Sequence, residues 1–201
     1  MIKSKKITRR FVIGILVTCP ILIGIFCFTV TTCTQNFHVL VPEEVYRSAQ
    51  PNSVFIKYMW KEHCLKSILN LRGKNDTPWY EEEKNTAKNL GIELIDFPIS
   101  ATKELNKKEI KQLISIFHKA PKPLLIHCKS GADRTGLASA LYLYFISKYP
   151  EQKARSQLSL LYGHIAFLNT RAMDKTFEKS IKKHLKITNQ HKINNYKTSI
   201  K

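Results

Sequence analysis

Apolar and polar positions along the chain fall into two kinds of segment that alternate. The compact apolar runs, which predict short buried strands, lie at 45–51, 66–72, 92–99 and 123–128. The segments that predict helices lie at 55–63, 79–90, 106–119, 135–147, 151–162 and 170–185. Strands that alternate with helices indicate an α/β fold, with a central, mostly parallel sheet flanked by helices.

Residues with strong local preferences mark the ends of several of these elements. Gly91 is expected to end the second helix, and Pro98 the strand at 92–99. Asn106 and Glu109 have the spacing of a capping box at the start of the next helix. Residues 73–78, "GKNDTP", read as a loop. The polar residues 187–201 are predicted to form a disordered tail.

An uncharged apolar run occupies residues 11–32 near the start of the chain. Its length suits a helix that crosses a bilayer and exceeds the apolar core of a typical cleaved signal peptide, so we expect an uncleaved transmembrane signal anchor. Five basic residues precede it without an acid, whereas the following twenty residues hold only Arg47 against two glutamates. The positive-inside rule then predicts a cytoplasmic N-terminus and a catalytic part outside the cytoplasm, as in the periplasm.

These features divide the chain into five predicted parts. They are a basic N-terminus (1–10), the transmembrane anchor (11–32), a linker (33–44), one globular domain (45–186) and the tail (187–201). Two other interpretations of the start remain open. "TRRFVI" faintly resembles a twin-arginine export signal, and "VTTC" a lipoprotein site.

The net charge of +18 is concentrated at the two ends of the chain. Such basic segments suit a solvated helix face or an anionic membrane surface. The sequence contains no nucleic-acid-binding module and does not interleave aromatic with basic residues, so no nucleic-acid partner is expected. No cofactor or metal is expected either.

The segment with the clearest chemistry is "LLIHCKSGADRTGLASALYLY", residues 124–144. A strand, a loop with Gly131 inside it and a helix start form the geometry of an anion cradle, because the backbone N–H groups point at one spot. Cys128 lies at the mouth of this loop, where those groups favour a thiolate. Arg134 follows at the helix start, and its planar fork can hold two phosphate oxygens. These are the parts needed for covalent catalysis on a phosphate ester.

The alternative is a buried cysteine followed by an ordinary turn. A cysteine with glycine, arginine and Ser/Thr at these spacings should occur by chance in roughly one chain in a thousand of this length. The functional interpretation is therefore the stronger one. "HCKSGADRTG" resembles the Cys-x5-Arg signature of the protein tyrosine phosphatase superfamily. The short domain, with "VYRSAQP", "ILNLRG" and "QLSLLYGH", resembles bacterial members of its dual-specificity branch.

This resemblance implies a role for each residue of the loop. Cys128 would be the nucleophile that forms a phosphocysteine, Arg134 would bind the phosphoryl group in the ground and transition states, and Thr135 would stabilise the departing thiolate. Backbone donors for the phosphate would come from Lys129, Ser130, Gly131, Ala132 and Asp133. His127 would hold the loop, and Lys129 would either face a highly charged substrate or lie exposed.

The family also uses an aspartic acid that protonates the leaving oxygen. Asp96, 32 residues before Cys128, is the first candidate, although many relatives carry this acid a few residues later, where the chain has "SATKEL". The alternative is a strand-end residue that hydrogen-bonds to a loop. Asp133, in the loop itself, is the second candidate and resembles the myotubularin arrangement. Its alternative role is a salt bridge to a neighbouring basic side chain.

The resulting hypothesis is a cysteine-dependent phosphatase that acts on phosphotyrosine or mixed phosphoprotein substrates. A phosphoinositide or inositol phosphate substrate is the alternative. Two other classes remain: a binding module for phosphorylated ligands, and a sulfurtransferase, which also uses a cysteine in such a loop. Structural pairing with carboxylates is the expected role of Arg47 and Arg72.

Overall fold

A computed structural model describes residues 14, 16, 18–19, 22 and 34–199. Its described residues include five strands in one sheet, ordered β1-β2-β5-β3-β4. The strands are β1 (His38–Val41), β2 (Val45–Ser48), β3 (Ser67–Asn70), β4 (Glu93–Asp96) and β5 (Leu124–His127). Strands β2, β5, β3 and β4 run parallel, and β1 pairs antiparallel with β2. The predicted α/β fold with a mostly parallel sheet is confirmed.

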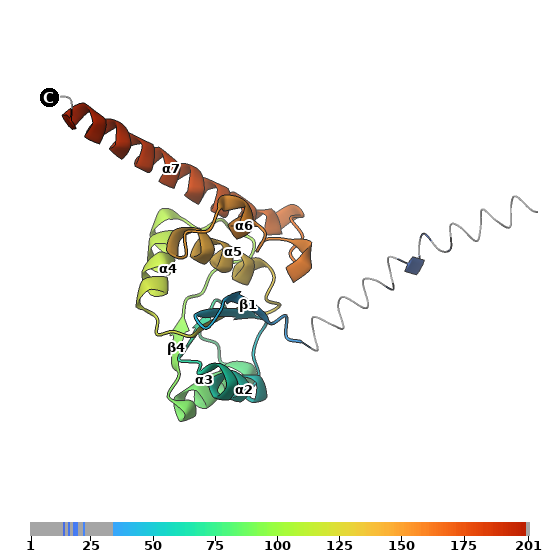
Figure 1. Ribbon diagram of the computed structural model, residues 1–201. Coiled ribbons are helices and arrows are strands. Elements are labelled where there is room, and N and C mark those ends of the chain that lie inside the picture. Colours follow the sequence, from blue (N-terminus) through green and yellow to red (C-terminus); the bar gives the residue numbers. More distant parts are fainter. Residues whose placement is uncertain (1–13, 15, 17, 20–21, 23–33, 200–201) are drawn as a thin grey trace, which may run out of the picture.

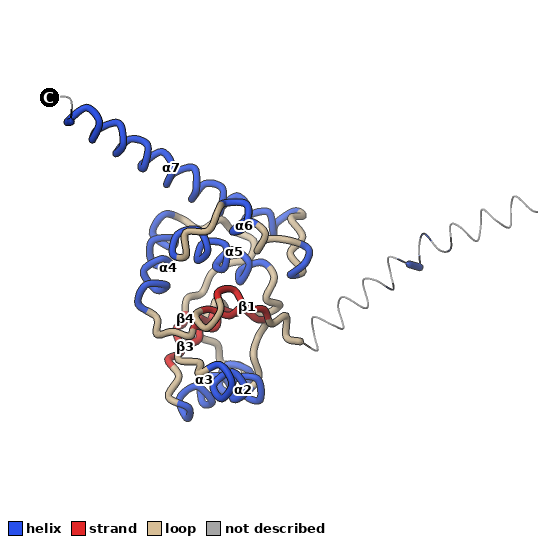
Figure 2. The backbone as a smooth tube through the Cα atoms, viewed as in Figure 1, coloured by secondary structure: helices blue, strands red, loops and turns tan. Residues whose placement is uncertain are grey.

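Helices cover both faces of the sheet (Figures 1 and 2). One face carries α2 (Ser53–His63) and α3 (Pro78–Leu90). The other carries α4 (Lys107–Lys119), α5 (Asp133–Leu141), α6 (Glu151–Arg155) and α7 (Arg171–Ser199). A π-helical turn (Tyr142–Ile146) extends α5, and two short 3-10 turns lie at Leu160–Tyr162 and Leu168–Thr170. The layers place the carboxyl ends of four parallel strands at one edge.

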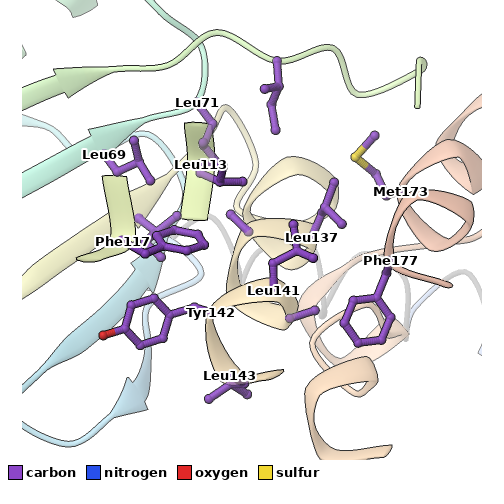
Figure 3. Close-up of a cluster of buried hydrophobic side chains, with 14 of the residues drawn as sticks. Leu69, Leu71, Leu113, Phe117, Leu137, Leu141, Tyr142, Leu143, Met173 and Phe177 are labelled. Carbon is purple, nitrogen blue, oxygen red and sulfur yellow. The ribbon is translucent and has the colours of Figure 1, made fainter. Parts of the chain in front are cut away.

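Each face of the sheet has its own hydrophobic core. The larger core joins the strands to α4, α5 and α7, and Figure 3 shows part of it. There the rings of Phe117 and Tyr142 lie edge to face, with 5.1 Å between their centroids. The smaller core packs Ile56, Met59 and Ala87 against the strands. Because β5 is buried on both sides, its end is a rigid support for the segment that follows.

The predicted end signals of the helices are confirmed. Asn106 accepts hydrogen bonds from the N–H groups of Lys108 and Glu109, and the Glu109 side chain accepts one from the Asn106 N–H, which completes the capping box. Gly91 ends α3 with a left-handed φ of 68°. Because these caps are local, the sequence was sufficient to find them.

Four elements differ from the sequence prediction. Strand β1 lies within the predicted linker at 33–44, where it extends the sheet by pairing with β2. The predicted helix at 135–147 changes to π-helical geometry after Leu141. The predicted helix at 151–162 ends at Arg155, where the N–H groups of Gln157 and Leu158 bond to carbonyls three residues back, and Arg47 donates to the Gln157 carbonyl just beyond. Helix α7 continues to Ser199 across the predicted tail, since no glycine or proline interrupts it.

The predicted transmembrane anchor at 11–32 and the basic segment at 1–10 lie almost entirely outside the described residues. In the part of the chain that is described, no helix has both the length and the apolar character needed to span a bilayer.

Candidate active site

The loop that follows β5 begins with Cys128, at the carboxyl end of a central strand. Cys128 is buried, with 2% of its surface exposed, and α5 begins five residues later at Asp133. Gly131 has a φ of +72°, and a Cβ there would lie 2.7 Å from the Ala49 nitrogen. Only glycine fits this position, because it lacks a Cβ and adopts the left-handed region without strain.

The carbonyl groups of this loop are all tied to the protein around it. The Lys129 carbonyl accepts from the Gln50 N–H at 3.1 Å, and the Ala132 carbonyl accepts from the Gly136 N–H at 2.8 Å. The Ser130 carbonyl accepts from Asn36 Nδ2 at 3.0 Å, and the Gly131 carbonyl accepts from Arg47 Nη2 at 2.7 Å. The peptide planes of the loop are therefore fixed from outside.

The amide N–H groups of residues 129–133, unlike the carbonyl groups, are not used by the described residues of the protein. Within the described part of the chain, none of them donates a hydrogen bond to a protein acceptor. With the carbonyls held outward, these N–H groups are left for a ligand, next to the positive end of the α5 dipole. The predicted set of backbone donors is thus present, and it suits an anion with several oxygens.

Arg134 and Thr135 lie in the first turn of α5. Arg134 is half-buried, and its Nη1 donates to the Leu71 carbonyl at 3.3 Å, which leaves other N–H groups of the guanidinium for a ligand. Thr135 is fully buried, and its Oγ1 has no hydrogen-bond partner among the described residues. A buried hydroxyl without a partner costs free energy, so its position is consistent with a donor to the Cys128 sulfur.

Arg47, on β2, is fully buried, and its expected pairing with a carboxylate is wrong. Its guanidinium donates to the Gly131 carbonyl and, at 2.7 Å, to Oε1 of Gln157, and it lies 4.0 Å from the centre of the Tyr162 ring. Burial lowers the pKa of Arg47 to about 10, which still leaves it charged at neutral pH. Arg47 therefore holds the catalytic loop in place through the Gly131 carbonyl.

Asn36 is a second residue that holds the loop, and no pattern in the sequence pointed to it. Only 2% of its surface is exposed, and its Nδ2 donates to the Ser130 carbonyl and, at 2.9 Å, to the Tyr162 carbonyl. His38 lies 3.1 Å from its Oδ1. The backbone φ of Asn36 is 47°, a left-handed value that asparagine tolerates well. Part of the predicted linker is thus built into the site.

A buried polar network lies behind the loop. His127 Nε2 lies 2.7 Å from Oε1 of Glu83, and both side chains are fully buried. Gln50 Nε2 donates to Glu83 Oε2 at 2.9 Å, and Gln50 Oε1 accepts from Arg72 Nη1 at 2.7 Å. The predicted supporting role of His127 agrees with this network. The sequence did not indicate Glu83, because a third glutamate in "YEEEK" has no distinctive pattern.

Arg72 is held at the mouth of the site. Its guanidinium stacks 3.4 Å from the centre of the Trp79 ring, and no carboxylate pairs with it in the described residues, contrary to expectation. Burial, followed by repulsion from Arg134, lowers the pKa of Arg72. Two guanidinium groups close enough to repel each other favour an anion between them.

The two predicted acids have different surroundings. Asp96, at the end of β4, accepts from Asn70 Nδ2 at 2.9 Å through one oxygen and from the Tyr80 hydroxyl at 2.6 Å through the other. Burial, followed by the bond to Asp96, raises the pKa of Tyr80. Both oxygens of Asp96 are thus occupied, as expected for the alternative role of a strand-end residue that fixes its neighbours.

Asp133 belongs to a chain of three ionisable groups. His164 Nδ1 lies 2.7 Å from Asp133 Oδ1, and its Nε2 lies 3.0 Å from Asp174 Oδ2 on α7. Burial alone would lower the pKa of His164, but hydrogen bonds to the two carboxylates outweigh it and raise that pKa. Asp133 Oδ2 makes no hydrogen bond within the described residues. The expected salt bridge of Asp133 is present, and one oxygen remains available.

Comparisons with known proteins agree with this geometry. A family model described as "DSP-PTPase phosphatase fused to NAD+ Kinase" matches residues 31–184. The inositol diphosphatase SIW14 of Saccharomyces cerevisiae is 30% identical over 148 residues, which cover 71% of this chain and 50% of that protein. The dual specificity protein phosphatase TpbA of Pseudomonas aeruginosa is 23% identical over 116 residues, or 57% of this chain and 49% of TpbA. The chain thus spans about half the length of these curated relatives.

Solved structures share the fold. The core catalytic domain of S. cerevisiae SIW14, in complex with citrate, superposes with a TM-score of 0.58 at 23% identity, covering 77% of this chain and 93% of that one. P. aeruginosa TpbA in complex with pTyr gives a TM-score of 0.54 at 20% identity, covering 72% and 83%.

Proposed function

The chain belongs to the DSP-PTPase family of phosphatases, and on that premise we propose that it hydrolyses phosphate monoesters through a phosphocysteine intermediate on Cys128. The observation that carries this proposal is the loop at 128–134. Its carbonyl groups are held outward and its amide groups have no protein acceptor among the described residues. Such donors stabilise the charge of a phosphoryl group during transfer without reorganising, which is the largest single contribution in many enzymes.

In the first step, the Cys128 thiolate attacks phosphorus in line with the leaving oxygen. The S–P bond forms, the P–O bond to the leaving group breaks, and that oxygen takes a proton from an acid. Arg134 and the loop N–H groups hold the three remaining phosphoryl oxygens. We assign to Thr135 Oγ1, which has no other partner among the described residues, the role of donating to the sulfur during the reaction, which would support the thiolate on its departure.

We assign the proton donor to Asp133 rather than Asp96. Both oxygens of Asp96 already accept hydrogen bonds, whereas Asp133 lies in the loop and keeps Oδ2 free within the described residues. Asp133 gives the proton carried on Oδ2 to the leaving oxygen, and the carboxylate that remains is stabilised by His164 at Oδ1, because hydrogen bonds to two carboxylates raise the pKa of His164 and keep it protonated. In the second step, water attacks phosphorus, the S–P bond breaks, and the proton of the water returns to Asp133.

Phosphotyrosine and mixed phosphoprotein substrates are the first proposed substrate class. TpbA, a relative, is named a dual specificity protein phosphatase and has been solved with pTyr. The aromatic ring of Trp79, stacked on Arg72 at the mouth, is a surface against which a phenyl ring can pack.

Inositol phosphates are the second class, and one observation favours them. Burial, followed by repulsion from Arg134, lowers the pKa of Arg72, and Lys129, in the same loop as Arg134, is exposed. A substrate with a second phosphate would place an anion beside Arg72 in addition to the one that Arg134 holds, whereas a phosphotyrosine supplies only one. SIW14, another relative, is named an inositol diphosphatase.

The test of the reaction is phosphate release from p-nitrophenyl phosphate by the full chain, beside Cys128→Ser. We expect turnover by the wild type and none by the variant. Absence of turnover by reduced, folded wild type would favour a phospho-ligand binding module instead. Phenyl phosphate, whose leaving group is poor, then tests the acid. The kcat of Asp133→Asn should fall about 100-fold on phenyl phosphate and little on p-nitrophenyl phosphate. The kcat of Asp96→Asn should fall by a similar factor on both substrates.

The substrate class is tested with Arg72→Gln. For an inositol polyphosphate substrate, the variant should raise KM about ten-fold or more, because one charged contact to the second phosphate is lost. For a phosphotyrosine peptide, KM should change less than about three-fold. A larger effect on the peptide than on the inositol polyphosphate would exclude the second class.

Membrane attachment through residues 11–32, with the catalytic part outside the cytoplasm, is a further part of this proposal. It rests on the uncharged run and on the basic residues that precede it. A reporter enzyme that is active on only one side of the membrane, fused after Lys201, tests the orientation. Activity restricted to a cytoplasmic reporter would contradict it.

A further inference from the structure

A groove of about 460 Å³ lies between α4 and α7, outside the active site. Its bed is apolar and contains Ile110, Ile114 and Phe145. Its rim carries Lys107, Lys111 and Lys183, whose side chains make no hydrogen bond or ion pair within the described residues. Glu104, which also lines the groove, is paired with Lys179. The groove therefore combines an apolar bed with lysine side chains whose positive charge is not paired with a carboxylate of the described residues.

Helices α4 and α7 lie on one side of the sheet, and α2 and α3 lie on the other (Figure 1). The net charge of the two pairs of helices differs sharply. Helix α4 carries four lysines against one glutamate, and residues 171–186 of α7 carry six basic residues against two acids, which gives a net charge of +7. Helices α2 and α3 carry four lysines against four glutamates and are neutral. Among these four helices, the excess of lysine is thus confined to α4 and α7.

We propose that the α4–α7 groove is a binding site for the head group and proximal acyl chain of an anionic phospholipid, and that it docks this face on an anionic membrane surface. The ligand must carry a negative charge for the lysines and an apolar part for the bed, and such a lipid has both. The volume is within the usual range of small-molecule sites. Lysine stems can lie along an apolar surface while their ammonium groups reach the phosphate plane.

The groove lies along α7, the same helix that contacts the catalytic loop at its start. Helix α7 begins beside the loop, where Asp174 contacts His164, and Lys179 and Lys183 follow five and nine residues later. At 1.5 Å per residue, these lysines lie about 8 and 14 Å from Asp174 along the helix axis. A lipid bound there would hold the active site near phosphate groups at the membrane. This consequence depends on the proposed function, whereas the binding itself does not.

The experiment measures the acetylation rate of each lysine by mass spectrometry. The full chain is placed in neutral detergent micelles with and without phosphatidylglycerol. Each lysine near an anionic surface strengthens the binding of the protein to that surface about five-fold. At a phosphatidylglycerol concentration of about four times the Kd, we expect Lys107, Lys111 and Lys183 to react about five-fold more slowly, because about four-fifths of the chains then hold the lipid. Lys57, Lys61 and Lys88, on α2 and α3, serve as internal controls and should change little.

Two further measurements separate this proposal from its alternatives. Glycerol phosphate alone should not protect the lysines, because the apolar bed would stay empty. The triple variant Lys107→Gln/Lys111→Gln/Lys183→Gln should bind phosphatidylglycerol about 100-fold more weakly, and the matched variant Lys57→Gln/Lys61→Gln/Lys88→Gln should bind it normally. Since lipid binding is measured without turnover, an inactive enzyme does not affect the result.

Three outcomes would overturn the proposal. The first is equal protection of the lysines on both faces, which would indicate attraction without a site. The second is protection by glycerol phosphate as strong as that by the lipid. The third is an absence of protection by the lipid, above all if a glutamate-rich amphipathic peptide does protect the groove lysines, because the partner would then be a protein.

Discussion

Replacing Asn36 with alanine tests whether the segment before β2 positions the catalytic loop. The Asn36 amide donates to the Ser130 carbonyl at 3.0 Å and to the Tyr162 carbonyl at 2.9 Å, with 2% of the residue exposed. Truncation removes the donor to each of these two part-buried carbonyls. Each lost hydrogen bond that leaves its acceptor unsatisfied costs about 1–3 kcal/mol, so we expect the loss of two to lower the free energy of unfolding by about 2–6 kcal/mol.

Asn36→Ala should also lower kcat, and by more than the loss of stability alone would cause. With its carbonyl released, the peptide at Ser130 can rotate and turn neighbouring N–H groups away from the phosphate. Loss of one such donor costs about 10²–10³-fold in kcat, and partial misalignment should cost about 10–100-fold. The assay is steady-state hydrolysis of p-nitrophenyl phosphate by the full chain, combined with urea denaturation of the same samples.

Two controls make this prediction specific. Asn36→Asp keeps the size of the side chain but removes its donors, so its kcat should fall as far as that of the alanine variant. Asn106→Ala removes the cap of α4, whose contacts lie within that helix, and costs about 1 kcal/mol of stability. Its kcat should be unchanged. Asn36→Ala with lower stability but a kcat within two-fold of the wild type would refute the positioning role.

Three further predictions concern the loop and its supports. Gly131→Ala should reduce kcat by more than about 100-fold, because the new Cβ would lie 2.7 Å from the Ala49 nitrogen in a left-handed conformation; steady-state kinetics measure it. Arg47→Lys keeps the charge but loses the planar fork that holds the Gly131 carbonyl, so kcat should fall about ten-fold or more in the same assay. Asp174→Asn should lower the raised pKa of His164. A histidine whose pKa is raised by folding stabilises the folded protein. This stabilisation is fully present below the pKa of the unfolded state, near 6.5, and is lost as the pH rises through the pKa of the folded state. Urea denaturation should therefore show a larger stability difference from the wild type at pH 6 than at pH 9.

The sequence predicted the local parts of this molecule well. The strands, the cap at Asn106 and the loop from Cys128 to Arg134 follow from patterns that span about ten residues or fewer. Each pattern depends on backbone preferences or on one short motif, so no tertiary information is needed. The same holds for Gly131, which is the glycine that the tight loop requires.

The supports of the loop could not be found in this way. Asn36 and Arg47 contact loop residues 94 and 84 positions away in the chain, and no local pattern connects them. The helix predicted at 151–162 is also shorter than expected, and the Gln157 carbonyl just beyond its end accepts a long-range hydrogen bond from Arg47. Long-range hydrogen bonds outweigh local helix propensity at such positions.

The most direct test of the central claim is to trap the intermediate. The full chain is mixed with p-nitrophenyl phosphate, quenched in acid during turnover and analysed by mass spectrometry after digestion. The account predicts a phosphoryl group on the sulfur of Cys128 and none in Cys128→Ser. Turnover without phosphate on Cys128, or retained turnover in the serine variant, would contradict it.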